Sequence, residues 1–284
     1  MKPASFTYHA PASLDEALGL LAELAPQDGR ILAGGQTLVP TMAFRMARPA
    51  HLIDINGIEE LRRLEVVDGW LRIGAGVRHA WFEGDRVPGA LGRLLRKVVR
   101  HIAHQPIRTR GTFCGSVANA DPASEWCCTT ATLDGVIVAQ SARGTRRIAA
   151  GDFYQGVMAT DLHEDEMVVR VELPLLDDAT RSGFCEFSRR AGDFAIAMVL
   201  AAYRIENGRI AEARIGVGGA EGAPRRIAEA EAALNGQPAS AATFDAAARA
   251  AAAAIMPFDD HNNTIEFRRS LVATLAKRAL EQAA

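Results

Sequence analysis

Near the N-terminus, the spacing of hydrophobic positions switches between helical and extended patterns. Apolar residues at 14, 17, 18, 21 and 24 predict an amphipathic helix, and Ser13 and Glu16 stand before it at capping-box spacing. The apolar run 31–33 predicts a short buried strand, 37–46 a helix with Pro40 in its first turn, and 51–55 a second buried strand. The order helix, strand, helix, strand favours a small α/β unit with parallel strands.

The pattern changes after residue 57. Two β-prone runs flank Asp68-Gly69, which is a hairpin signal, so antiparallel sheet is expected to begin here. Apolar residues between Leu91 and Ile102 share one face of a predicted helix, and further strands are predicted within 135–150 and 166–174. From about residue 178, two long β-prone stretches at 184–205 and 209–219 precede alanine-rich helices at 226–236, 242–255 and 265–283.

These patterns predict an α+β protein with three parts, at residues 1–57, 58–176 and 177–284. The chain has 284 residues, 49% of them hydrophobic, which is enough to bury a substantial core. Its 32 Lys and Arg nearly balance 34 Asp and Glu, which argues against a nucleic-acid or anionic-membrane surface. Because neither a signal-peptide core nor a run of about 18 apolar residues is present, we expect a cytoplasmic protein.

The cysteines and histidines give no metal-binding pattern. Cys114, Cys127, Cys128 and Cys185 lack CxxC spacing, and neither His101 nor His104 has a cysteine or carboxylate at ligand spacing. We therefore expect no zinc or iron-sulfur cluster in this chain, and reduced thiols.

Two glycine-containing segments are candidates for binding an anion. Gly34-Gly35 separates the first predicted strand from the following helix, and residues 111–116 read GTFCGS. Glycine allows positive φ and close approach, so that successive backbone N–H groups can face one anion. Hydroxyls of Thr37, Thr112 and Ser116 flank the glycines, which favours a pyrophosphate; the alternative is two tight turns. Neither segment carries a Walker lysine or a GxGxxG fingerprint, and we interpret residues 216–222 (GVGGAEG) as a turn.

Several motifs in order resemble a known family: LAGGQTLVPTMAFRMARPAHLIDI, LRIGAGVRH, IRTRGTFCGSVANADPASEW, FSRRAGDFA and FRRSLVATLAKRAL. The chain is similar over nearly its whole length to the FAD-binding medium subunit of molybdenum hydroxylases, such as carbon monoxide dehydrogenase and bacterial xanthine dehydrogenase. This resemblance implies the vanillyl-alcohol-oxidase (PCMH)-type FAD-binding fold of two subdomains, followed by a C-terminal domain of small antiparallel sheet and helical bundle.

The resemblance also implies an oxidoreductase subunit that carries FAD. Electrons would come from a large molybdopterin subunit through two [2Fe-2S] clusters on a small subunit, within an (αβγ)2 assembly, and leave to an external acceptor. The flavin would perform the redox step, so no catalytic side chain or metal ligand is expected in this chain. The alternatives are a stand-alone vanillyl-alcohol-type flavin oxidase and an assembly subunit that has lost FAD.

By position in these motifs, the resemblance assigns three groups of residues to FAD. The pyrophosphate would be wrapped by the backbone amides of Ala33, Gly34, Gly35, Gln36 and Thr37, and a second loop, Thr112, Phe113, Cys114, Gly115 and Ser116, would close on its other side. Leu32 and Leu38 are assigned to the same cofactor site. Ribityl or ribose hydroxyls would meet Asp121 and Glu125, since a carboxylate accepts from two donors at once. The flavin ring would lie near Ile102, Leu162, Glu186 and Phe194.

Three of these positions carry alternatives. Cys114 replaces a glycine usual in the family, so the backbone there must accommodate a small side chain with ordinary angles. Phe194 either stacks over the flavin or is a core aromatic in a strand. Glu186 stands where several members have lysine, and it is either a solvated strand residue or an inward carboxyl. An inward Glu186 would lower the flavin potential or be protonated.

Overall fold

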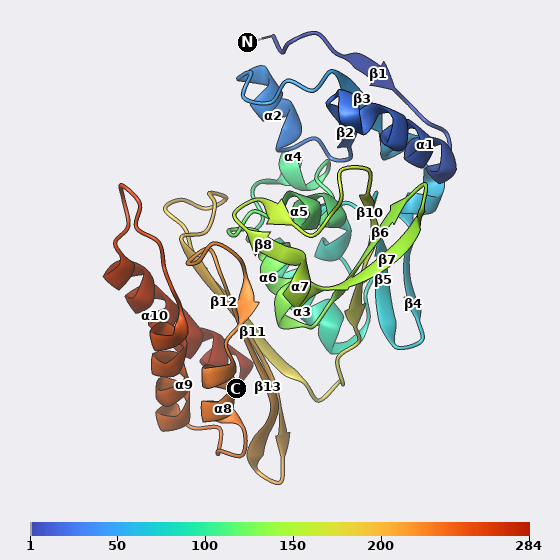
Figure 1. The fold of residues 1–284 in the computed structure, drawn as a ribbon. Helices are drawn as coiled ribbons and strands as arrows, with labels where there is room; N and C mark the ends of the chain where they lie inside the picture. The colour runs from blue at the N-terminus through green and yellow to red at the C-terminus, as the bar shows by residue number, and fades with distance from the viewer. Residues whose placement is uncertain (1) are drawn as a thin grey trace.

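The computed structural model describes residues 2–284, which form three main sheets (Figure 1). The first sheet has the order β1 (Thr7–His9), β3 (His51–Asp54), β2 (Gly29–Leu32), and both pairings are parallel. Helix α1 (Leu14–Leu24) begins at Ser13, whose side chain accepts from the Glu16 amide. The predicted α/β unit is therefore confirmed, with α2 (Leu38–Ala43) after β2. Strand β1 was not predicted, because it is only three residues long.

The second sheet is antiparallel, in the order β4 (Leu64–Val67), β5 (Trp70–Gly74), β10 (Met167–Pro174), β6 (Val136–Ser141), β7 (Gly144–Ala149). Asp68 and Gly69 both adopt positive φ, at 50° and 80°, which confirms the predicted hairpin turn. Helices α3 (Gly89–Val99), α5 (Phe113–Asn119) and α6 (Glu125–Thr132) bury apolar side chains in the same core as this sheet and α1.

Short elements connect these layers. They are the 3-10 helices Ala25–Gln27, Ile55–Gly57, Glu59–Arg62 and His79–Glu83, the helices α4 (Gln105–Arg108) and α7 (Ala150–Phe153), and the hairpin of β8 (Tyr154–Gly156) with β9 (Ala159–Thr160).

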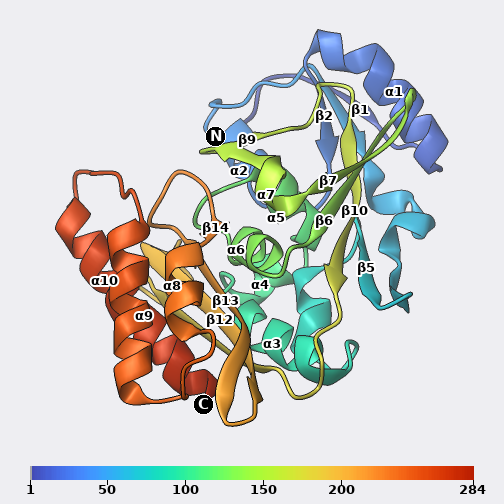
Figure 2. The ribbon, with the colours of Figure 1, turned by 60° about the horizontal axis from the view of Figure 1, so that its bottom comes forward.

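The third sheet has the order β11 (Arg181–Phe187), β12 (Ala197–Glu206), β13 (Arg209–Gly218), β14 (Arg225–Arg226), all antiparallel. One face carries α8 (Ala228–Leu234), α9 (Ala241–Ala254) and α10 (Ile265–Ala283), and Figure 2 shows these helices away from the first two sheets. The opposite face packs on α3 and α6. The β-prone stretch 184–205 falls in two strands, β11 and β12, joined by the loop 188–196, where Gly192 has a φ of +86°.

None of the helices formed by residues 2–284 has the length and apolarity needed to cross a bilayer.

Gly19 tests the intrinsic stability of α1. It lies on the exposed side of that helix, and an added Cβ would have no neighbour within 4 Å. We expect Gly19→Ala to raise the free energy of unfolding by about 0.5–1 kcal/mol, because alanine loses less backbone entropy in a helix. Urea denaturation measures the change. Gly29→Ala should have the opposite effect, since its Cβ would lie 2.6 Å from the Leu24 carbonyl oxygen; a destabilised Gly19→Ala chain would contradict the prediction.

Candidate functional site

A cavity of about 590 Å³ opens where the first sheet, α5 and the loop 188–196 come together. Every predicted site residue lines it except Phe113 and Glu186; the lining members are Leu32, Ala33, Gly34, Gly35, Gln36, Thr37, Leu38, Ile102, Thr112, Cys114, Gly115, Ser116, Asp121, Glu125, Leu162 and Phe194. Its volume is in the range of small-molecule and cofactor sites. The fold thus brings distant predicted residues to one cavity; Leu32 and Phe194, for example, are 162 positions apart in the sequence.

The first glycine segment is a turn pressed against another part of the backbone. A Cβ on Gly34 would lie 2.6 Å from both the Arg110 carbonyl oxygen and the Gly111 Cα, and Gly35 has a φ of +69°. Within residues 2–284, the amides of residues 34–37 donate no hydrogen bond to the chain itself. These N–H groups are therefore available to an anionic ligand.

An arginine that the sequence patterns did not single out joins the two segments. Arg78 donates to the Asn56 side-chain oxygen at 2.5 Å and also to the Arg110 carbonyl oxygen. Asn56 in turn donates to the Ala33 carbonyl oxygen at 2.8 Å. This chain of hydrogen bonds holds the Gly34 turn and the Gly111 segment together from one side.

The second glycine segment is the start of helix α5 and not the tight turn given as the alternative. Thr112 caps α5, and its Oγ1 accepts from the Gly115 amide at 3.0 Å. Cys114 has no positive φ, and its thiol donates to the Ile73 carbonyl oxygen at 3.2 Å inside the core. The backbone thus accommodates the Cys114 side chain with ordinary angles, as expected. Gly115 and Ser116 line the cavity, and their small side chains leave that side of the helical turn open.

Phe113 does not reach the cavity. Its ring is fully buried and stacks on Trp126, with centroids 4.6 Å apart, and its amide donates to the Val77 carbonyl oxygen. Helical periodicity explains the correction: once α5 begins at residue 113, adjacent side chains point in different directions, and that of Phe113 points into the core.

His79 lines the cavity, although the sequence assigned it no site. The indole N–H of Trp126 donates to His79 Nδ1 at 2.9 Å. Burial, together with the positive charges of Arg78 and Arg108, lowers the pKa of His79 to about 3. His79 is therefore neutral near pH 7. No local motif signals this contact, because its partner lies 47 residues away.

Two acidic residues face the cavity. Asp121 Oδ1 accepts from the Ala123 amide at 2.9 Å, and Glu125 is the first residue of α6. Burial raises the pKa of Glu125, and the charge of Asp121 raises it further.

Glu186 lies on β11. Its side chain is 3% exposed, which shows that the interpretation as a solvated strand residue is wrong. It points inward but does not line the cavity itself. The alternative interpretation of Phe194 as a core aromatic in a strand is wrong, because Phe194 lies in the loop 188–196 and is 72% exposed where it lines the cavity.

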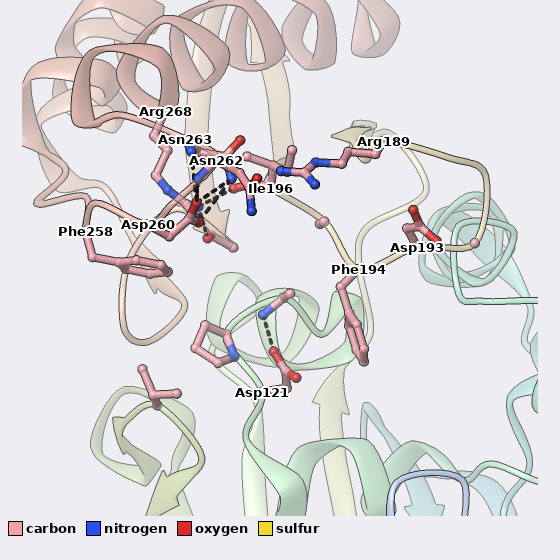
Figure 3. Close-up of a pocket in the computed structure, with 16 residues that line it drawn as sticks. Asp121, Arg189, Asp193, Phe194, Ile196, Phe258, Asp260, Asn262, Asn263 and Arg268 are labelled. Atoms are coloured by element: carbon pink, nitrogen blue, oxygen red, sulfur yellow. Dashed lines mark hydrogen bonds and ion pairs between the residues drawn. The ribbon is translucent and has the colours of Figure 1, made fainter. Parts of the chain in front are cut away.

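A second cavity, of about 610 Å³, adjoins the first and shares Asp121, Gly192, Asp193 and Phe194 with it. Figure 3 shows Asp121 and Phe194 across this cavity from the cluster of Asp260 and Arg268. Arg268 donates to the carbonyl oxygens of Ile196 and Gly219 at 2.9 and 2.8 Å, and to Asp260. The loop 188–196 is thereby tied to the C-terminal helices.

Residues 2–284 contain no group of three or more His, Cys, Asp or Glu side chains arranged to hold a metal ion.

Comparison with known proteins shows which protein families have this architecture. Residues 4–176 match the family described as "FAD binding domain in molybdopterin dehydrogenase", and residues 182–283 match the "CO dehydrogenase flavoprotein C-terminal domain". The nicotine 6-hydroxylase medium subunit of Paenarthrobacter nicotinovorans is 37% identical, covering 100% of this chain and 99% of its own. The carbon monoxide dehydrogenase medium chain of Hydrogenophaga pseudoflava is 30% identical, covering 100% and 98%.

Two solved structures have the same fold. Carbon monoxide dehydrogenase from Hydrogenophaga pseudoflava superposes with a TM-score of 0.95 at 33% identity, and quinoline 2-oxidoreductase from Pseudomonas putida 86 with 0.94 at 36%. Each match covers 100% of this chain and 98% of the matched chain. The expected fold, an FAD-binding region followed by a C-terminal domain of sheet and helices, is confirmed.

Fold and relatives define an oxidoreductase flavoprotein component. The chain belongs to the family of FAD-binding medium subunits of molybdenum hydroxylases.

His79 predicts a specific pH dependence of stability. Its pKa is lower in the folded chain than in the unfolded one, so the unfolded state binds more protons between about pH 6.5 and 3, and stability falls as the pH falls through that window. The variant His79→Gln retains an acceptor for Trp126. Between pH 8 and pH 5, we expect its free energy of unfolding to fall by about 2 kcal/mol less than that of wild type. Urea unfolding at both pH values measures this, with exposed His261→Gln as the control. Parallel pH profiles for wild type and His79→Gln would contradict it.

Proposed function

We propose that this chain carries FAD in the cavity of about 590 Å³ and transfers electrons from iron-sulfur clusters of a partner subunit to an external acceptor. One observation carries the proposal: the turn at Gly34-Gly35 meets the Gly111 backbone so closely that only glycine fits, and its amides remain free. Such an arrangement suits a pyrophosphate, which accepts hydrogen bonds from successive backbone N–H groups.

The residues present fit the rest of the cofactor. Amides of residues 34–37, with the hydroxyls of Thr37 and Ser116, would hold the pyrophosphate, and Asp121 and Glu125 would accept from ribityl or ribose hydroxyls. The apolar side chains of Ile102 and Leu162 and the exposed ring of Phe194 would border the flavin. FAD supplies the redox chemistry when bound, and the protein binds and tunes it.

The partners belong to the same proposal. Relatives bear the names medium subunit or medium chain, which supports a complex with a large and a small subunit. We propose that the large subunit carries the molybdopterin cofactor and the small one two [2Fe-2S] clusters, in a cytoplasmic (αβγ)2 assembly. We also retain the division into FAD-binding subdomains 1–57 and 58–176 and a C-terminal domain 177–284.

Gly34→Ala tests the pyrophosphate turn. The new Cβ would displace the Arg110–Gly111 backbone or the turn itself, so the amides of residues 34–37 would no longer point at the ligand. Because a hydrogen bond to a charged group contributes about 1.5–3 kcal/mol, we expect FAD to bind at least about tenfold more weakly. Titration of the purified chain with FAD, followed by flavin absorption and fluorescence, measures the dissociation constant. Gly19→Ala is the matched control and should bind like wild type; equal affinity in Gly34→Ala would exclude this turn as the binding site.

The electron route has its own test. We expect the FAD-loaded chain alone to keep its flavin oxidised with candidate small-molecule substrates, and to be reduced only when co-purified with the large and small subunits. Anaerobic absorption spectra report the flavin state. Reduction by a substrate in the absence of both partners would instead support the stand-alone flavin oxidase.

A further inference from the structure

The cavity of about 610 Å³ lies beside the first cavity and shares one wall with it. The shared wall consists of Asp121 and of residues 192–194 in the loop 188–196. Most of the opposite wall comes from the C-terminal domain, from the segment between α9 and α10 and from Arg268 of α10. A ligand in the second cavity would therefore lie next to a flavin in the first.

Buried Arg268 fixes the C-terminal side of this cavity. It is 4% exposed, and its guanidinium carbon lies 4.2 Å from the centre of the Phe258 ring. Asp260 pairs with Arg268 and also accepts from the amides of Asn262 and Asn263, at 2.7 and 2.9 Å. These contacts hold the segment between α9 and α10 in place, so the cavity is formed before any ligand binds.

Large apolar side chains line this cavity although water can reach them. Phe194 is 72% exposed, Val157 62% and Phe258 40%. Figure 3 shows the rings of Phe194 and Phe258 on opposite sides of the cavity. Exposed apolar side chains that gather around one concave site are typical of ligand-binding sites. A planar aromatic ligand would cover both rings.

The charges around the cavity argue against an anionic ligand. Two guanidinium groups and three carboxylates line it, those of Arg189, Arg268, Asp121, Asp193 and Asp260. The formal charge of the lining is therefore one unit negative, and one of the two guanidinium groups is already paired with a carboxylate. A pyrophosphate, such as that of a dinucleotide, needs an excess of positive charge or free backbone amides. A neutral ligand suits this lining better.

Two exposed side chains provide hydrogen-bond donors at the cavity. Arg189 and Asn262 both line it, and both are exposed. Guanidinium and amide N–H groups donate to carbonyl oxygens. A neutral aromatic ring that carries carbonyl oxygens would therefore meet apolar surface and hydrogen-bond donors in the same place.

We propose that the second cavity binds the external electron acceptor and that this acceptor is a neutral quinone. Its ring would lie against Phe194 and Phe258, and its carbonyl oxygens would accept from Arg189 and Asn262. The proposal rests on the proposed function, because the electrons come from FAD in the adjoining cavity. FADH2 and a quinone give FAD and a hydroquinone, so two electrons and two protons change carrier and no further reactant is consumed.

Equilibrium dialysis of the FAD-loaded chain against duroquinone tests the site without turnover. The ring of duroquinone is fully substituted, so it has no free position for the addition of a cysteine thiol. We expect Phe258→Ala to weaken binding at least about fivefold, because one of two aromatic surfaces is lost. The matched control is Phe267→Ala, since Phe267 is also 40% exposed but does not line the cavity. Its affinity for duroquinone should equal that of wild type.

Val157→Trp is a second variant that leaves the contact of Phe258 with Arg268 in place. Val157 is exposed in the turn between β8 and β9, so an indole there would fill the ligand space and disturb no buried contact. We expect this variant also to bind duroquinone at least about fivefold more weakly. Both variants should bind FAD like wild type, because neither Val157 nor Phe258 lines the first cavity.

Reoxidation of the flavin tests the role of the site. The FAD-loaded chain is reduced photochemically without oxygen and mixed with duroquinone, and flavin absorption follows the reaction. We expect the half-saturating quinone concentration to rise at least about fivefold in Phe258→Ala and Val157→Trp, and to stay unchanged in Phe267→Ala. Ferricyanide requires no aromatic site, so it should reoxidise all four proteins at the same rate.

The outcomes separate the quinone site from the cofactor assignment. FAD uptake is read first from the visible spectrum, so a wild-type chain that never takes up FAD overturns the proposed function and the quinone site together. An FAD-loaded chain that binds no duroquinone, or binds it equally well in every variant, overturns the quinone site alone. Reoxidation by NAD that is slowed in Phe258→Ala, without binding of duroquinone, would indicate a dinucleotide in this cavity and also overturn the proposal.

Discussion

The approach of two backbone segments at Gly34 is the constraint on which the site depends. The Gly34 Cα hydrogens face the Arg110 carbonyl oxygen and Gly111 Cα, and a methyl group would lie 2.6 Å from either atom. The contact joins the first sheet to the segment that precedes α5. Arg78 and Asn56 stabilise the same junction, because Arg78 donates to the Arg110 carbonyl oxygen and to Asn56, and Asn56 donates to the Ala33 carbonyl oxygen. The amides on the turn donate no hydrogen bond within residues 2–284, because the turn lies after the end of β2 and before the first residue of α2.

Helix α6 connects this site to the third sheet. Every residue from Trp126 to Thr132 is buried, because α6 lies between the FAD-binding region and strands β12 and β13 (Figure 1). Its threonine hydroxyls are satisfied locally: those of Thr129, Thr130 and Thr132 donate to carbonyl oxygens four residues earlier at 2.6–2.7 Å. Gly216 of β13 allows Thr132 to touch the sheet, since a Cβ there would overlap the threonine. The position of Glu125 is therefore determined by packing on both faces of its helix.

Local patterns predicted the elements whose signals are local. The capped helix at Leu14, the hairpin at Asp68-Gly69 and the alanine-rich helices follow from spacing and turn chemistry, and all are present. The resemblance placed most of the predicted site residues around one cavity. The features that the sequence did not predict depend on tertiary contacts. His79 is held at the cavity by a hydrogen bond from Trp126. The loop 188–196 interrupts a β-prone run because Arg268 donates to the Ile196 carbonyl oxygen and Gly192 takes a positive φ.

The buried glutamates show why burial alone does not determine charge. Glu172 is 2% exposed, yet Arg147 and Arg170 lie 2.6 and 2.7 Å from its oxygens, and these guanidinium groups lower its pKa. Glu166 has the same relation to Arg146. Both lie in or beside the second sheet, where an arginine can reach in from solvent. Glu186 is 3% exposed, and among residues 2–284 the one basic nitrogen within 4.0 Å of its carboxyl is His101 Nδ1, at 3.9 Å. Burial, together with the charge of Glu125, raises the pKa of Glu186, because no cation replaces the water that the carboxyl has lost.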